Sequence, residues 1–308
     1  MMNLTILGSS SALPTSERNP SAHVLNVHER FFLIDCGEGT QLQLRKYHIR
    51  FSRINHIFIS HLHGDHVFGL YGLLSTFSLM GRVAPLHIYA PENYGAMLTA
   101  HLADFDIRLS FEIDFIPLKG NDPVKILDTK YLTVTSFPLV HRVPSYGFLF
   151  TEKPYDRNIK REAITKYSIP VSRIPSIKKG ADFVLEDGNV ITNSEITTDP
   201  PEPLSFAYCS DTRYFKRLPS FIKGASLLYH EATFGKDKSE LAAMTGHSTT
   251  TEAATVAKEA GVRRLIIGHF SARYNDTDEL LEEARSIFPE TWAAEDGRSY
   301  DAGSIEPF

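Results

Sequence analysis

The chain has 308 residues, which is enough for one large domain or two medium ones. Hydrophobic residues make up 42% and charged residues 22%, as in an ordinary soluble globular protein, and no apolar run approaches the roughly 20 residues of a membrane-spanning helix. The net charge of −5 excludes a basic character of the whole chain, so any nucleic-acid partner must be bound by a local patch.

The first half alternates short apolar strands with amphipathic helical patterns. The predicted strands are 3–8, 23–27, 30–35, 55–60, 86–90, 110–116, 131–138 and 146–151, and the predicted helices are 39–47, 66–80 and 92–104. The alternation resumes later, with strands at 204–209, 225–229 and 263–268 and helices at 213–222, 249–260 and 276–287. Two βα-rich halves of similar build favour one α/β domain over 1–308, a four-layer sandwich with two sheets packed face to face.

Residues 152–200 differ from both halves. They contain four prolines and few large apolar residues outside a short helical pattern at 157–167. Over 151–180, eight basic residues oppose three acidic ones, so this stretch carries +5 and the rest of the chain −10, the difference between −5 and +5. A compact domain has little reason to keep a long irregular segment without a function, although a solvated lysine-rich loop is the simpler alternative.

Residues 61–66 read His-Leu-His-Gly-Asp-His, directly after an apolar run. In an extended stretch His61 and His63 point the same way, and a turn at Gly64 then brings Asp65 and His66 to a second position. Imidazole and carboxylate are ligands that suit Zn²⁺. The spacing therefore predicts a metal site; a surface cluster or a purification tag is the alternative, but a tag would lie at a terminus.

Three further polar residues, His141, Asp211 and His269, each follow an apolar strand. A ligand at a strand's carboxyl end is held by rigid backbone while its side chain reaches the crevice beyond the sheet. We therefore expect two zinc ions, one bound by His61, His63 and His141, the other by Asp65, His66 and His269, with Asp211 bridging them. Two carboxylates offset only part of the +4 of two Zn²⁺, which favours an anionic, phosphate-like substrate.

Asp35 ends another apolar strand and is expected to accept an N–H from a metal-bound imidazole. The alternative is that it caps the helix that follows Gly37.

Two further segments carry a family resemblance. His230-Glu231-Ala232-Thr233 and His247-Ser248-Thr249 resemble the HEAT and HST motifs of tRNase Z, a member of the metallo-β-lactamase superfamily, and the stretches around Asp211 and His269 are similar to that family's. The resemblance implies a metallo-β-lactamase fold and a zinc-dependent endoribonuclease that removes the 3′ trailer of tRNA precursors, leaving a 3′-hydroxyl on the tRNA and a 5′-phosphate on the trailer. It also implies a homodimer, in which the flexible basic arm at 152–200 of one subunit holds the tRNA that the other cuts.

The chain departs from the family pattern in two places. Ser16 stands where the family's loop, here 14–19, has a lysine, and the tip of the arm at 169–175 lacks the Gly-Pro pair. The resemblance still implies RNA contacts from the following residues: Arg18, Asn19, Arg157, Lys160, Arg161, Lys178, Lys179 and Arg273.

The chemistry of phosphodiester cleavage assigns roles to three residues. Asp65, beside the metals, is the expected proton acceptor. His247 is expected to protonate the departing ribose 3′-oxygen, with Glu231 orienting its imidazole and raising its pKa. The alternative for His247 is support of a helix start, a role that better suits Ser248 or Thr249.

Two other classes of function remain open from the residues. One is a small-molecule hydrolase of the same fold, such as a lactonase, a thioesterase or a cyclic-nucleotide phosphodiesterase. The other is a non-catalytic RNA-binding module, although structural zinc sites are usually closed and four-coordinate. We expect no membrane or DNA partner. We expect a cytoplasmic location, because Cys36 and Cys209 form no disulfide framework and the N-terminus lacks the basic start of a signal peptide.

Overall fold

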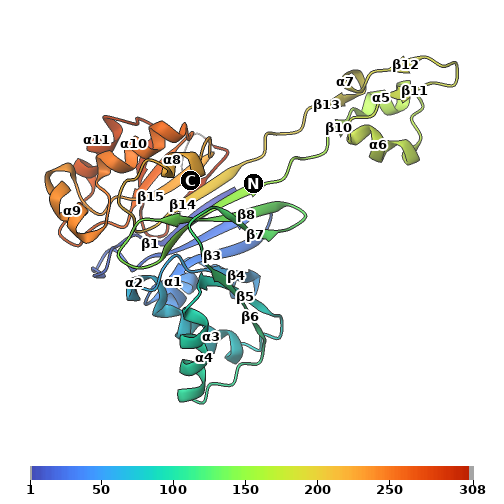
Figure 1. Cartoon of the computed structure of the whole chain (residues 1–308). Coiled ribbons are helices and arrows are strands. Elements are labelled where there is room, and N and C mark those ends of the chain that lie inside the picture. The colour runs from blue at the N-terminus through green and yellow to red at the C-terminus, as the bar shows by residue number, and fades with distance from the viewer. Residues whose placement is uncertain (1, 305–308) are drawn as a thin grey trace. The chain divides into compact units, whose positions relative to one another are not determined.

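The computed structural model describes residues 2–304 (Figure 1). The chain forms two compact units: a larger one built from the residues up to Thr151 and those from Leu204 onward, and a smaller one, Glu152–Pro203. No helix in the described part of the chain has both the length and the apolar character needed to cross a membrane.

The larger unit contains two seven-stranded sheets. The first has the order β18 (Ser299–Asp301), β1 (Met2–Gly8), β2 (Ala22–Val27), β3 (Arg30–Cys36), β4 (Ile54–Phe58), β5 (Leu86–Pro91) and β6 (Ile113–Leu118). The second has the order β17 (Thr291–Ala293), β16 (Leu265–Gly268), β15 (Leu227–Glu231), β14 (Ser205–Cys209), β9 (Ser145–Glu152), β8 (Leu132–Leu139) and β7 (Val124–Asp128). Strands β3 to β6 are parallel, as are β14 to β17.

Helices cover the outer face of each sheet (Figure 1). Those of the first half are α1 (Thr40–Lys46), α2 (Gly64–Val67), α3 (Gly69–Leu79) and α4 (Tyr94–Asp104), with the short 3₁₀ turn η1 (Phe51–Arg53). Those of the second half are α8 (Leu218–Phe221), α9 (Ser239–Thr245), α10 (Thr250–Ala260) and α11 (Asp278–Arg285), with η3 (Lys236–Lys238). The expected four-layer α/β arrangement is confirmed.

Aromatic side chains fill the space between the two sheets. Phe58 of the first sheet packs on Phe148 of the second with ring centroids 5.3 Å apart, and Phe32 packs on Phe150 at 5.7 Å. A second apolar cluster, which includes Leu33 of β3, lies beneath α1, α3 and α4. The central strands are thus buried on both faces, which explains their continuous apolar sequences and holds their carboxyl ends in fixed positions.

Several boundaries differ from the sequence prediction. The predicted helix 66–80 is divided into α2 and α3 at Phe68, the predicted helix 213–222 contains only the short α8, and the strand predicted at 110–116 lies later, as β6. Strands β7, β17 and β18 and helix α9 were not predicted. β7 is largely exposed and β17 and β18 have three residues each, so none of these strands shows a period-two apolar pattern.

The smaller unit is not the irregular segment that its sequence suggested. It contains β10 (Asn158–Ile159), α5 (Arg161–Lys166), η2 (Val171–Arg173), α6 (Ile174–Lys178), β11 (Phe183–Val184), β12 (Val190–Ile191), α7 (Asn193–Ile196) and β13 (Thr197–Thr198). These short elements enclose a hydrophobic cluster that includes Ile169, Ile177 and Ile196. The apolar residues are spaced too irregularly for a periodic pattern to reveal them.

Candidate active site

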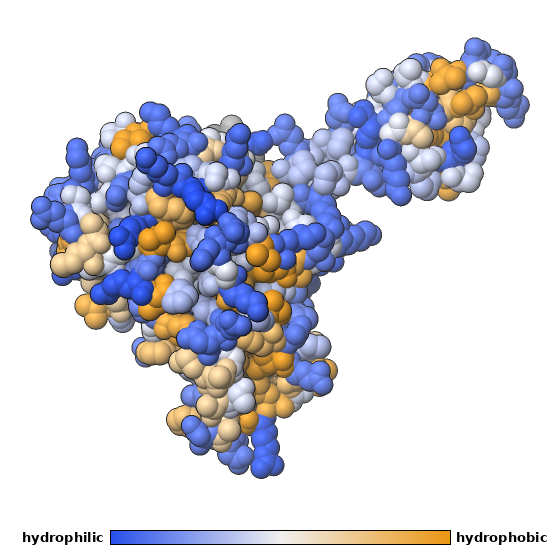
Figure 2. Space-filling view, viewed as in Figure 1, coloured by the Kyte–Doolittle hydropathy of each residue, from blue (hydrophilic) through white to orange (hydrophobic). Residues whose placement is uncertain are grey.

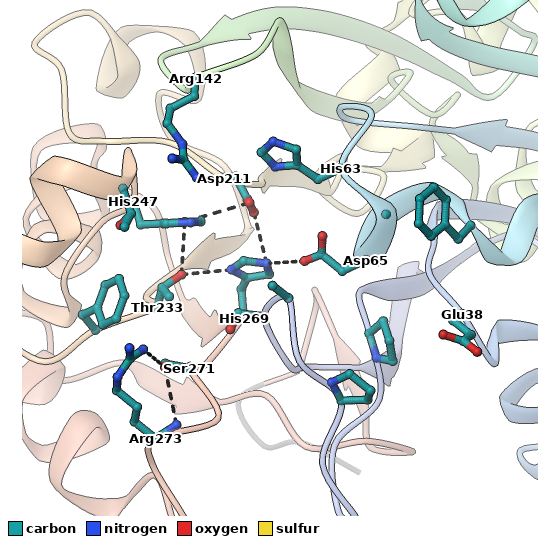
Figure 3. Close-up of a pocket in the computed structure, with 18 residues that line it drawn as sticks. Glu38, His63, Asp65, Arg142, Asp211, Thr233, His247, His269, Ser271 and Arg273 are labelled. Carbon is teal, nitrogen blue, oxygen red and sulfur yellow. Dashed lines mark hydrogen bonds and ion pairs between the residues drawn. The ribbon is translucent and has the colours of Figure 1, made fainter. Parts of the chain in front are cut away.

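The seven predicted metal ligands come together where strands of the two sheets end. His61 and His63 follow β4, Asp65 and His66 begin α2, and the remaining three follow strands of the second sheet: His141 follows β8, Asp211 follows β14, and His269 follows β16. Their donor atoms fall into groups compatible with a metal ion. The side chains of His63, Asp65, Asp211 and His269 point toward one another in Figure 3.

One group contains three imidazoles and a carboxylate. His61 Nε2 lies 3.1 Å from His63 Nδ1, which lies 3.3 Å from His141 Nε2. Asp211 Oδ2 is 3.4 Å from His61 Nε2 and 3.8 Å from His141 Nε2. These four residues can offer one donor each to a single ion.

The second group contains Asp65, His66 and His269. The two Nε2 atoms are 3.3 Å apart, and Asp65 Oδ2 lies 3.3 Å from that of His66 and 3.4 Å from that of His269. The other oxygen of Asp211, Oδ1, is 3.4 Å from His66 Nε2 and 3.2 Å from His269 Nε2. Asp211 therefore presents one oxygen to each group, as a bridging ligand does.

The protonation of the imidazoles supports a cation at each group. His66 Nδ1 lies 2.8 Å from Asp35 Oδ2, and His141 Nδ1 lies 2.8 Å from the carbonyl oxygen of Gly246. An oxygen of this kind can only accept, so each Nδ1 carries a proton, and in the neutral imidazole that a metal ion requires each Nε2 keeps its lone pair. Several lone pairs and two carboxylates then face one another at little more than 3 Å, an arrangement that a metal ion stabilises. These residues fit the zinc ions that the sequence predicted.

The surroundings favour the neutral form of His63 and His141, as metal ligands require, whereas burial of His66 is outweighed by Asp65, Asp211 and Asp35, which raise its pKa. Burial, with His61 and His141 close by, lowers the pKa of His63 to about 4. Burial likewise lowers the pKa of His141.

Asp35 lies at the end of β3, fully buried beneath the metal ligands. Its carboxylate accepts hydrogen bonds from the Ser60 backbone N–H at 2.7 Å, the Ser60 hydroxyl at 2.9 Å, the Tyr208 hydroxyl at 2.7 Å and the imidazole of His66. Burial raises its pKa, but these contacts outweigh burial and leave the pKa below its usual value. Helix α1 begins at Gly39 without a side-chain cap, so the alternative of a helix cap at Asp35 is wrong.

Asp35 and His269 both have a left-handed backbone, with φ of 56° and 61°. This conformation is uncommon for residues other than glycine and marks positions that the surrounding structure enforces. Both residues lie at the metal groups.

Gly64 has a different role from the one predicted. It begins α2 with an ordinary backbone and is not among the residues with positive φ in the described chain. A Cβ atom at this position would overlap the ring of Phe68. Glycine here leaves room for the ring of Phe68, a side chain that is itself largely exposed, and serves no unusual turn.

Glu231 and His247 form a hydrogen-bonded pair beside the second metal group. His247 Nδ1 lies 3.0 Å from Glu231 Oε1. That oxygen also accepts the backbone N–H groups of Thr212 and Ser248, each at 3.0 Å, while Oε2 accepts the N–H of Thr233 at 3.0 Å and its hydroxyl at 2.8 Å. Burial raises the pKa of Glu231, but His247 outweighs burial and keeps the carboxyl ionised.

Burial lowers the pKa of His247, but the carboxylates of Glu231 and Asp211 outweigh burial and raise it to about 9. The imidazole therefore carries a proton at neutral pH. Helix α10 is capped instead by Thr249, whose side chain accepts the N–H of Glu252 in a capping box. His247 is free of the helix-start role that was its alternative.

A cavity of about 560 Å³ opens above the metal groups. Its wall includes Asp65, Asp211, His247 and His269 together with two arginines, Arg142 and Arg273 (Figure 3). Arg142 was not predicted; its position directly after His141 was the available signal.

Two of the predicted RNA contacts do not line this cavity. Arg18 donates to the carbonyl oxygen of Tyr274 and lies over the ring of Phe270, with 5.9 Å from its guanidinium carbon to the ring centroid. Asn19 donates from its backbone and its side chain to Asp296, at 2.8 and 3.0 Å. In this structure both residues anchor the loop 14–19, whereas Arg273 does line the cavity.

The predicted basic contacts of the smaller unit fall into two kinds. Arg157 donates to Thr197 and pairs with Asp199, and Lys160 donates to the carbonyl oxygen of Glu195 at 2.7 Å, so both have a structural role. The remaining three are exposed or half-buried: Arg161, Lys178 and Lys179.

Known proteins resemble the chain over nearly its full length. A protein named Ribonuclease Z from Bacteroides fragilis is 46% identical over 293 residues, which cover 95% of this chain and 96% of that protein. Ribonuclease Z from Porphyromonas gingivalis is 43% identical over 296 residues, covering 96% and 97%. Residues 2–170, more than half of the chain, also match the family model described as Anti-Pycsar protein Apyc1.

Solved structures agree with these relatives. The short form of human tRNase Z has 28% sequence identity and a TM-score of 0.72, covering 98% of this chain and all of that one. The metallo-beta-lactamase fold protein YhfI from Bacillus subtilis, 20% identical, has a TM-score of 0.69 and covers 97% of this chain and 98% of its own. The predicted metallo-β-lactamase fold is confirmed.

Proposed function

The chain belongs to the ribonuclease Z family, as its sequence resemblance predicted, and on that premise we propose how it cuts RNA. It is a hydrolytic endoribonuclease of tRNA 3′ processing. We propose that it depends on two zinc ions and leaves a 3′-hydroxyl on the tRNA and a 5′-phosphate on the trailer. The observation that carries this proposal is the convergence of seven candidate metal ligands beside the hydrogen-bonded pair of a protonated His247 and an ionised Glu231.

In this proposal His61, His63 and His141 hold one ion, Asp65, His66 and His269 hold the other, and Asp211 contacts both. Zinc ions bound there would supply Lewis acidity, which polarises a phosphodiester and acidifies a water molecule. The two arginines of the cavity wall, Arg142 and Arg273, add positive charge for the RNA backbone.

His247 is the proposed general acid. The departing ribose 3′-oxygen is costly to expel without a proton, and the raised pKa of His247 keeps one available. Glu231 holds the imidazole at Nδ1, so the free Nε2 is the atom that can deliver a proton. Because all five of its contacts stabilise the carboxylate form, Glu231 orients His247 and does not itself carry the proton.

Asp65 is the proposed proton acceptor. Burial raises its pKa, but the imidazoles of His66 and His269 outweigh burial and hold the carboxyl ionised. Its side chain is largely buried, with 9% of its surface exposed, but it lines the cavity, where it can take a proton from an attacking water molecule.

The smaller unit is the proposed tRNA-binding arm. Its basic stretch is concentrated in an otherwise acidic chain, and structured RNA is read largely through its shape and backbone. Each lysine or arginine that contacts a phosphate releases a counterion, so tRNA affinity should fall steeply with salt. The loop residues Arg18 and Asn19 would then act through the position of their loop rather than by lining the cavity.

We also propose that the protein is a homodimer in the cytoplasm. Hydrophobic side chains gather on the surface over α3 and α4 (Figure 2), and Leu79, Met80 and Val83 are among the exposed ones. Such a patch favours association with a second copy. Both cysteines are free, as expected in a reducing compartment. Light scattering should report a dimer that Met80→Glu weakens; a wild-type monomer would contradict this part of the proposal.

Replacement of the arm tests the function. Thr151 pairs with Ser205 across the antiparallel strands β9 and β14, so an Asn-Gly turn can replace 152–204 without separating them. The variant should lose tRNA-precursor binding by orders of magnitude yet still hydrolyse a p-nitrophenyl phosphodiester. As a matched control, Arg161→Gln, Lys178→Gln and Lys179→Gln together remove charge and leave the unit's core in place.

The same assay should include a cyclic nucleotide and a thioester. Efficient cleavage of either by the wild-type protein, with none of the tRNA precursor, would support a small-molecule hydrolase instead. Undiminished tRNA cleavage without the arm would reject the arm's role.

A further inference from the structure

Two hydroxyl groups occupy equivalent positions behind the metal groups. Thr233 Oγ1 lies 2.8 Å from Glu231 Oε2 and 2.9 Å from Nδ1 of His269. Ser60 Oγ lies 2.9 Å from Asp35 Oδ2 and 3.0 Å from Nδ1 of His61. In each case a hydroxyl stands between a buried carboxylate and a metal-binding imidazole.

The direction of these hydrogen bonds follows from proton counting. A hydroxyl has one proton to donate, and an ionised carboxylate can only accept. The Thr233 hydroxyl therefore donates to Glu231, and its free lone pair accepts the N–H of His269. The proton of His269 is thereby fixed on Nδ1, which leaves the lone pair on Nε2, the atom that faces Asp65, Asp211 and His66.

The same count holds for Ser60. Its hydroxyl also lies 3.1 Å from the hydroxyl of Ser210, but the ionised carboxylate of Asp35 is nearer and is the stronger acceptor for its one proton. It therefore donates to Asp35 and accepts the N–H of His61, whose Nε2 then faces His63 and Asp211. The two hydroxyls thus serve different metal groups, and each keeps one imidazole in the tautomer that can bind an ion.

The third contact of the Thr233 hydroxyl is with His247, whereas that of Ser60 is with the hydroxyl of Ser210. Thr233 Oγ1 lies 3.3 Å from His247 Nδ1, and its donation to Glu231 Oε2 helps to hold the carboxylate whose other oxygen holds His247. No catalytic acid adjoins Asp35 among its hydrogen-bonding partners in the described chain.

We propose that Thr233 is a positioning residue that orients the metal ligand His269 and the general acid His247 at the same time. Ser60 performs only the first of these tasks, for His61. This inference rests on the proposed function, because it assigns Thr233 to the zinc centre and to the acid of that reaction.

A structural role for Thr233 is separable from this one. Its backbone N–H bonds to Glu231 and its carbonyl oxygen accepts from Ser271, and neither contact needs the side chain. Thr233→Val keeps the branched shape and removes only the hydroxyl. Thr233→Ser keeps the hydroxyl and should therefore keep both tasks. If Thr233 served only packing, Thr233→Val would behave like the wild-type protein.

The first measurement is zinc binding to the apoprotein, by competition with a chromophoric chelator. Thr233→Val and Ser60→Ala should each lower the affinity for one of the two zinc ions by about 10–100-fold, the usual effect of removing a hydrogen-bonding partner of a metal ligand. The double variant with Ser60→Ala and Thr233→Val should bind both zinc ions more weakly. Wild-type zinc affinity in Thr233→Val, with an unchanged melting temperature, would overturn the proposal.

The second measurement is cleavage at saturating zinc, on a tRNA precursor and on a p-nitrophenyl phosphodiester whose leaving group needs no proton. Thr233→Val should show a larger deficit on the precursor, and Ser60→Ala an equal deficit on both. Equal deficits for Thr233→Val would remove its link to His247. If the wild-type protein fails to cut the precursor, the proposed function fails, while the zinc titration still decides the metal-positioning part.

Discussion

The two sides of the metal centre use the same device for different ends. On the side of the first sheet, the hydrogen-bonding partners of the buried Asp35 carboxylate within residues 2–304 all hold the site together: the backbone and hydroxyl of Ser60, the hydroxyl of Tyr208 and His66. On the side of the second sheet, the buried carboxylate of Glu231 also contacts His247, whose free nitrogen faces the cavity. Under the proposed function, a buried anion at a strand end would thus serve metal binding alone or serve proton delivery as well.

Asp211→Ala should have the largest effect, because this residue belongs to both sides. Each of its oxygens faces one metal group, so its loss should lower the zinc content and abolish hydrolysis while the fold largely persists. Metal analysis and circular dichroism of the purified variant check this. Full activity with two zinc ions would refute the bridging role.

His247→Ala should affect only the Glu231 side. The cleavage rate of a tRNA precursor should fall by ~10²–10⁴-fold, the range for general acid–base groups, with little change in zinc content. On a p-nitrophenyl phosphodiester the deficit should shrink. An equal loss on both substrates would argue against an acid role.

Asp35→Asn should affect only the Asp35 side of the metal centre, and it should lower activity less than His247→Ala does. The amide can no longer accept all of the hydrogen bonds that orient His66 and Ser60, so zinc affinity should fall by about 10–100-fold. Excess zinc should restore most of the activity, which His247→Ala cannot regain. If excess zinc did not restore the activity of Asp35→Asn, Asp35 would serve more than metal binding, and the contrast with Glu231 would be wrong.

The smallest effect concerns pH. The pKa of His247 is raised to about 9, so the acid is protonated at neutral pH and loses its proton as the pH rises through that value. Cleavage of a tRNA precursor at saturating zinc should therefore fall above about pH 9, by up to tenfold per pH unit. His247→Ala should lack this decline; its persistence would assign it to another group.

The sequence predicted the ligands of the site better than their surroundings. His61 to His66 and the polar residues that end apolar strands are local signals, so spacing and strand periodicity were sufficient to bring all seven to one place. The partners Ser60 and Thr233 were not assigned a role, because a hydroxyl next to a histidine acquires meaning only when a carboxylate from a distant strand meets it. The role of Gly64 was predicted wrongly for the same reason: the ring that a side chain there would meet belongs to Phe68, four residues later.

The core of the smaller unit was missed because Ile169, Ile177 and Ile196 follow no helical or strand period. Cluster formation by such short elements depends on tertiary packing, which a local pattern does not contain.

The division of the metal ligands between two sheets also governs how the protein is made. Four ligands precede or begin α2, yet the last, His269, lies 203 positions after His66. At roughly 5–20 residues per second, a ribosome needs about 10–40 s to add it, so the emerging hexapeptide has no complete site to offer during that interval. Zinc ions held by these residues would therefore favour the finished fold over the unfinished chain, and at 100-fold over its dissociation constant each ion would stabilise that fold by about 2.7 kcal/mol. Free zinc would therefore add stability to the newly synthesised enzyme, whose fold is expected to persist largely without it.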